Sequence, residues 1–130
     1  MANLVMNNSL SVSPTVGGQP AISQIFTTAL SVATYSESVV TPPNTVVTLA
    51  SLIGSLGTSA LRLRNITPST VAGSSLIQVS TGGVVIAILA PGQEMVIVGS
   101  VAGSLVSPFA VQQTGTATAG LTQLYVLTAT

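Results

Sequence analysis

Four side chains carry every formal charge of this sequence: Glu37, Arg62, Arg64 and Glu94. Two carboxyl groups could form the acid and base of a glycosidase, an enzyme that also needs aromatic side chains to hold the sugar. The sequence contains no Trp and only two Tyr, so we expect no catalytic residues. Asp, Lys, His and Cys are absent, which removes nucleophilic triads, Schiff-base lysines and the usual metal ligands. The sequence therefore predicts a non-enzymatic protein without a metal or cofactor site.

The two arginines are the residues best suited to contact a charged partner. Arg62 and Arg64 lie two positions apart in a predicted strand, so they leave the same face of the strand about 7 Å apart. They could dock on an acidic partner surface, or they could pair within the chain with Glu94 or Glu37. Two cations are too few for binding that depends on neutralising phosphates, so we expect no nucleic-acid partner.

The composition favours an all-β fold. Val, Ser and Thr supply 52 of the 130 residues, and the β-branched side chains of Val and Thr suit a pleated surface. Twelve Gly and seven Pro suit tight turns between strands. We predict an antiparallel β-sandwich or jelly roll of about eight short strands with an extended N-terminal arm. The predicted strands are residues 25–35, 45–50, 59–66, 76–80, 84–89, 94–98, 109–113 and 121–127.

Residues 76–98 predict a three-stranded meander. Gly82 and Gly83 suit the positive φ angles of a hairpin turn, and Pro91-Gly92 suits the central positions of a type II turn. Residues 84–89 are apolar without alternation, which predicts a central strand that is covered on both faces.

Residues 1–23 differ from the rest of the chain, because Asn, Gly and Pro separate single apolar residues and no strand longer than about four residues is indicated. We therefore predict an arm over residues 1–23 and a β-sandwich domain over residues 24–130. The arm is interpreted either as a frayed terminus or as an extended segment that orders on a neighbouring subunit. In the second interpretation, its partner-binding anchors are Val5, Leu10, Val12 and Val16.

The scarcity of charge predicts a protein that works inside an assembly. Only 3% of the residues are charged and the formal net charge is zero, so little electrostatic repulsion opposes self-association. No Lys protects the strand edges. We expect a homo-oligomer or a subunit held by apolar burial and strand-edge hydrogen bonds. The mean hydropathy is +0.76, but Ser, Thr and Gly interrupt the apolar stretches, so we expect no membrane span.

Three segments follow one another in a characteristic order: Leu61-Arg62-Leu63-Arg64-Asn65-Ile66, Ile77-Gln78-Val79-Ser80 and Ile86-Ala87-Ile88-Leu89-Ala90-Pro91-Gly92-Gln93-Glu94. This order resembles small β-sandwich virion proteins of tailed bacteriophages, and the resemblance covers about residues 60–98. It implies a virion protein of one of three kinds: a capsid decoration (cement) protein, a head-fibre base, or a small tail or neck component. The implied partners are the major capsid protein or other virion proteins, clasped by an N-terminal arm.

Two other functions fit the same sequence. An extracellular filament subunit would use its N-terminal segment to complete the sheet of the next subunit, by donor-strand exchange. A carbohydrate-binding module would need exposed aromatic side chains. Tyr35 and Tyr125 are the candidates for that role, and we expect both to be half-buried in strands.

Overall fold

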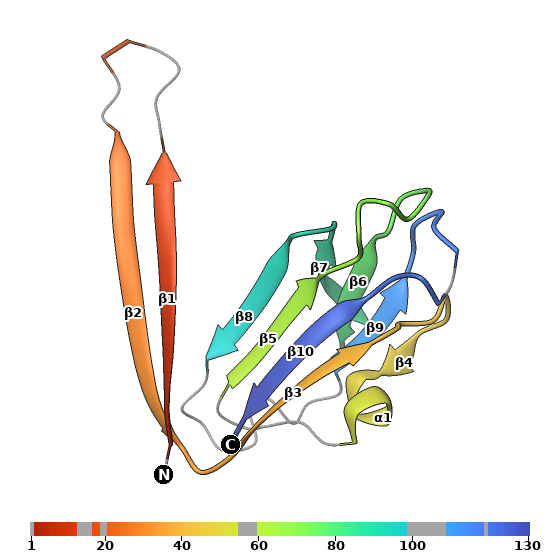
Figure 1. Ribbon diagram of the computed structural model, residues 1–130, viewed down its shortest axis with the longest axis horizontal. Helices are drawn as coiled ribbons and strands as arrows, with labels where there is room; N and C mark the ends of the chain where they lie inside the picture. The colour runs from red at the N-terminus through yellow and green to blue at the C-terminus, as the bar shows by residue number, and fades with distance from the viewer. Residues whose placement is uncertain (1, 13–16, 19–20, 55–59, 99–108, 119) are drawn as a thin grey trace. The chain divides into compact units, whose positions relative to one another are not determined.

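The computed structural model describes residues 2–12, 17–18, 21–54, 60–98, 109–118 and 120–130. The chain divides into two compact units, Met1–Ala33 and Thr34–Thr130. Figure 1 shows the first unit as a two-stranded ribbon and the second as two facing sheets. The division lies at residue 33, whereas the sequence predicted an arm that ends at residue 23.

The first unit is an antiparallel hairpin of β1 (Ala2–Val12) and β2 (Ile22–Val32). Its ladder is regular along the whole length of both strands. The prediction that residues 1–23 hold no long strand was wrong, because β1 has 11 residues. Single apolar residues separated by polar ones were interpreted as an irregular arm. The same alternation is typical of a strand with one apolar and one polar face.

The second unit holds two four-stranded antiparallel sheets, with the orders β3-β10-β5-β8 and β4-β9-β6-β7. The pairs are nested: β3 pairs with β10, β4 with β9, β5 with β8 and β6 with β7. This is the strand order of a jelly roll, and it confirms the predicted all-β sandwich. The elements are β3 (Tyr35–Val40), β4 (Val47–Thr48), α1 (Leu49–Ile53), β5 (Ala60–Asn65), β6 (Ile77–Thr81), β7 (Val84–Leu89), β8 (Glu94–Val98), β9 (Phe109–Gln113) and β10 (Leu124–Ala129).

The core lies between the two sheets and is filled mainly by aliphatic side chains. In β5 the residues alternate as predicted, so Leu61 and Leu63 are buried in the core while Arg62 and Arg64 lie on the other face. Leu49 was predicted within a strand over residues 45–50; it instead begins α1 and is also buried in the core. The buried core residues are Leu49, Leu61, Leu63, Ile77, Val79, Leu89, Phe109, Val111, Leu124 and Val126.

The predicted meander over residues 76–98 was wrong. Strands β6 and β7 form a hairpin whose Gly82 and Gly83 have φ angles of +56° and +80°, but the next strand, β8, pairs with β5 in the other sheet. The predicted type II turn joins β7 to β8, and its Gly92 has the required positive φ of +85°. Among the described residues β7 is therefore an edge strand, not the covered central strand that its apolar sequence predicted.

A buried amide side chain joins the two sheets. Asn65, the last residue of β5, is 0% exposed, and its Nδ2 donates to the carbonyl of Ser75 at 2.7 Å and to that of Leu89 at 2.8 Å. Its Oδ1 accepts from the backbone amide of Thr67 at 3.1 Å. Ser75 precedes β6 and Leu89 ends β7, so one side chain of the first sheet is bonded to two points at the second.

Candidate functional site

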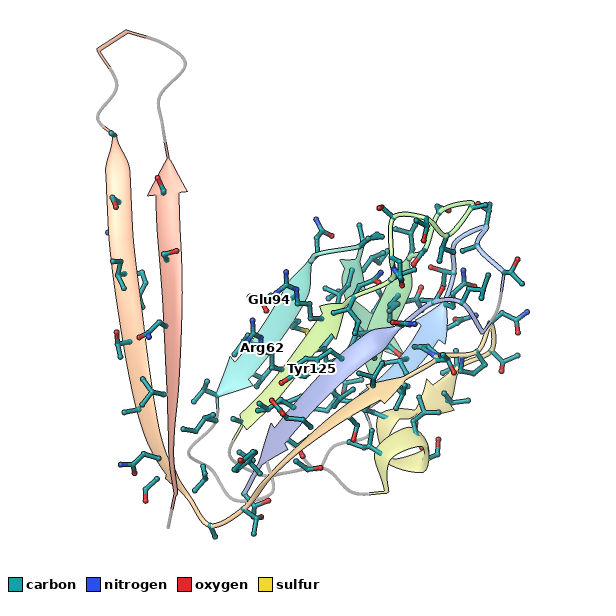
Figure 2. The ribbon with its side chains drawn as sticks, viewed as in Figure 1. Arg62, Glu94 and Tyr125 are labelled. Atoms are coloured by element: carbon teal, nitrogen blue, oxygen red, sulfur yellow. The ribbon has the colours of Figure 1, made fainter. Side chains whose placement is uncertain are left out.

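The outward side of the β3-β10-β5-β8 sheet carries every charged residue of the sequence. The strand registers place Glu37, Arg62, Arg64 and Glu94 there, together with Tyr125 of the central strand β10. We call these five residues the charged face. Figure 2 labels three of them, Arg62, Glu94 and Tyr125, on strands β5, β8 and β10.

Arg62 and Glu94 form an ion pair on this face. Arg62 Nε donates to Glu94 Oε2 at 2.7 Å, and Arg62 Nη2 lies 2.6 Å from the same oxygen. The contact is diagonal, since Glu94 stands directly opposite Arg64 in the ladder and yet binds Arg62. Both side chains remain partly exposed, so water screens the pair and its contribution to stability is about 0.2–1 kcal/mol. The predicted internal pairing is thereby confirmed for Arg62.

Tyr125 and Glu37 form the second polar contact of the charged face. The Tyr125 hydroxyl donates to Glu37 Oε1 at 2.6 Å. Partial burial of the phenol raises the pKa of Tyr125 to about 12, and the hydrogen bond to Glu37 and the negative charge of that carboxylate add to the increase. The positive charge of Arg62 acts in the opposite direction. The pair therefore extends the pH range over which Tyr125 stays protonated, and it joins β10 to β3.

Arg64 differs from its neighbour Arg62. Its side chain is exposed, and within the described part of the chain it makes no ion pair or side-chain hydrogen bond. The two arginines were equivalent in the sequence analysis, whereas in the structure only Arg62 pairs with the carboxylate of Glu94. Contact between Arg64 and an acidic partner stays a prediction, and Arg62 is already engaged.

The hairpin has two unlike faces. Even-numbered positions of β1 pair with even-numbered positions of β2, and odd with odd. Nine of the twelve even positions hold apolar residues, against three of the ten odd positions. Because successive strand residues belong to opposite faces, the ribbon has an apolar even face and a polar odd face. On the odd face, Thr27 Oγ1 donates to Asn7 Oδ1 at 2.9 Å. The apolar even-face residues are Ala2, Leu4, Met6, Leu10, Val12, Ile22, Phe26, Leu30 and Val32.

The four predicted anchors do not share one face. Leu10 and Val12 stand at even positions, Val5 stands at an odd position, and Val16 lies outside the described residues. Sequence reasoning missed Phe26, which stands on the even face and is 57% exposed. The signal that could have found it is the same even-numbered alternation, which continues from β1 into β2.

The two tyrosines do not form one aromatic platform. Tyr35 is 63% exposed, so the prediction that it is half-buried was wrong, whereas Tyr125 is half-buried as predicted. The difference follows from position, since β3 is an edge strand and β10 has a neighbour on each side. Tyr35 stands opposite Ala129, four residues from Tyr125, which separates the two by about 13 Å along the strands.

The charged face was compared with known kinds of site through its acidic residues and through similar proteins. Within the described ranges no three His, Cys, Asp or Glu side chains come together. No helix in the described part of the chain is both long enough and apolar enough to cross a membrane. No family model, curated protein or solved structure matches the chain. A functional proposal therefore rests on the surfaces of the hairpin and the sandwich.

Proposed function

We propose that the chain is a non-enzymatic structural subunit of a bacteriophage particle, a capsid decoration protein that binds the capsid through its hairpin and stabilises it. The observation that carries the proposal is the apolar even face of the hairpin. A two-stranded ribbon is marginally stable in water by itself. When a partner surface covers the apolar face of such a ribbon, apolar area is removed from water, and this burial stabilises the ribbon.

Two further observations support this class of protein. The segments over residues 60–98 resemble small virion β-sandwiches, as described above. The jelly roll is also the fold of many viral capsid proteins, although lectins and cupins share it, so this support is an analogy at the level of fold.

The hairpin sequence defines the chemistry of the partner surface. Residues 1–33 contain no charged side chain, so attraction between opposite charges cannot drive the contact. The partner surface is expected to be apolar where it covers the even face, with polar groups around it that bond the Ser and Asn side chains. Binding of this kind changes little with ionic strength, because salt screens charges and leaves apolar burial intact.

Neighbouring residues of β2 provide a matched test of the proposal. Phe26 stands on the even face and Ile25 on the odd face, and they are 57% and 73% exposed. We expect Phe26→Ser to weaken binding to undecorated capsids by about 30-fold, since burial of an aromatic side chain contributes about 2 kcal/mol. Ile25→Ser should bind as the wild type does. Co-sedimentation with capsids measures both, and equal losses in the two variants would contradict the proposed role of the even face.

A filament subunit is the second candidate, because the hairpin strands have no charged residue to protect their outer edges. Strand β1 is paired with β2 along its whole length, so donating residues 1–23 alone would break that ladder. A filament would have to donate the whole hairpin. Negative-stain electron microscopy separates the candidates: long, salt-resistant fibres favour the filament, and small oligomers that bind capsids favour decoration.

A further inference from the structure

The sandwich has four edge strands, and three of them are protected against pairing with another chain. Edge strands present unpaired backbone N–H and C=O groups, which proteins commonly block with charges or by keeping the strand short. Strand β3 carries Glu37, β8 begins with Glu94, and β4 has only two residues. Strand β7 has six residues and no charge, so among the four described edge strands of the sandwich it is the one that lacks both protections.

Strand β7 also presents a set of aliphatic side chains beside this open edge. Val84, Val85, Ile86 and Ile88 are all exposed, whereas Leu89 is buried in the core and anchors the end of the strand. An exposed, uncharged and aliphatic edge strand is the kind that readily accepts another strand. The partner that fits such an edge is therefore an extended segment with apolar side chains.

A β-bulge lies within the run of three consecutive exposed residues of β7. Val79 pairs with Ala87, but the next residue of β6, Ser80, pairs with Val85, which leaves Ile86 as an extra residue. The bulge interrupts the alternation between inward and outward positions. Strand β7 therefore lacks the regular alternation of exposed and buried residues along its length.

We propose that β7 pairs with β7 of a second copy of this chain, antiparallel about a two-fold axis, and so joins two four-stranded sheets into one. Charge is the reason for choosing a second copy. Antiparallel self-pairing of β3 would bring Glu37, near the middle of the strand, close to its own copy, which is unfavourable. Self-pairing of β8 would place the charge of Glu94 opposite the apolar end of the second copy, at Val98. Self-pairing of β7 brings only apolar residues together. Two-fold dimers of this kind are also the commonest symmetric oligomers.

The mass of the full-length protein in solution tests this dimer. Sedimentation equilibrium at micromolar concentrations should show twice the chain mass of 12.9 kDa. Ile88→Lys should raise the dimer dissociation constant at least about a hundredfold, because each copy then places a charge at the shared edge. Leu121→Lys is the matched control, since Leu121 lies in the loop before β10 and is 50% exposed against 53% for Ile88. A monomeric wild-type protein overturns the proposal, and so does a dimer that Ile88→Lys leaves intact.

Hydrogen exchange of the wild-type protein tests the same edge without any substitution, so it decides the question if Ile88→Lys disturbs the fold. Backbone amides of residues 84–89 should exchange more slowly as the protein concentration rises and the dimer forms, whereas those of β3 should not change. A dimer that forms without slower exchange in β7 overturns the proposal. Both measurements use purified protein without capsids, so their failure is distinct from failure of the proposed capsid binding.

Discussion

Replacing Asn65 by Ala tests the idea that one buried amide fastens the two sheets of the sandwich together. The side chain is 0% exposed and makes three hydrogen bonds, two from Nδ2 to the carbonyls of Ser75 and Leu89 and one to Oδ1 from the amide of Thr67. All three partner residues are buried, so water cannot replace the lost bonds without opening the structure. Asn65→Ala should therefore reduce stability strongly without touching the aliphatic core.

The size of the loss follows from the three bonds. A hydrogen bond contributes about 1 kcal/mol net, and a buried group left without a partner costs about 1–3 kcal/mol, so Asn65→Ala should lower the free energy of unfolding by about 3–6 kcal/mol. Whole domains are stable by about 5–15 kcal/mol, so this loss would be a large share of the total stability. Asn65→Asp should lose at least as much, because a carboxylate oxygen would then face two carbonyl oxygens.

Urea denaturation followed by far-ultraviolet circular dichroism measures this effect. The slope of free energy against urea should stay constant, so that the shift in midpoint reports stability. Gln112→Ala is the control: its Nε2 makes one bond, at 2.8 Å to the carbonyl of Asn44, and it is only half-buried. That variant should lose about 1 kcal/mol or less. A loss below about 1 kcal/mol in Asn65→Ala would refute the reasoning.

Two further predictions concern pH and backbone packing. The pKa of Tyr125 is about 12 in the folded protein against a reference value of 10.0, so the folded state holds a proton that the unfolded chain releases. The raised pKa therefore contributes to the free energy of unfolding below pH 10, and this contribution is lost as the pH rises to about 12. Tyr125→Phe should lack the contribution. If the urea midpoints of the two proteins changed in parallel between pH 10 and about 12, the argument would be contradicted. Gly115→Ala would place a methyl group on the backbone carbonyl of Ser74, so it should cost about 1–3 kcal/mol or more. Gly17→Ala meets no atom of the described residues within 4 Å, so it should be neutral by thermal denaturation. Equal melting temperatures in the two Gly variants would show that the backbone at Gly115 moves without cost.

Local features of the chain were predictable because they depend on near neighbours in sequence. The Leu-Arg alternation over residues 61–64 predicted both the strand and the side of it that faces the core, and β5 has that arrangement. Pro91-Gly92 predicted a type II turn, and Gly92 has the positive φ angle that this turn requires. Strand period and turn chemistry are properties of a few consecutive residues, so no knowledge of the fold was needed for them.

The two faces of the hairpin were not predicted from the sequence. Alternation in β1 was present in the sequence, but separate polar residues among single apolar ones also fit an irregular arm. The pairing of β1 with β2 removes the ambiguity, because it aligns the even positions of both strands on one face. An amphipathic ribbon therefore becomes visible only when both strands are considered together.

The tertiary structure alone decided which strands meet and which surfaces remain open. Residues 84–89 have the composition of a covered central strand, yet the nested pairing of the jelly roll leaves β7 at an edge. In the same way, the arrangement of β5 beside β8 lets Glu94 form an ion pair with Arg62, while Arg64 remains exposed. By itself the sequence determined the all-β class, the turns and the inward side of β5, since these follow from backbone geometry and side-chain period. Pairing partners and edges follow from contacts between residues far apart in the chain, which compete with one another and leave no local signal.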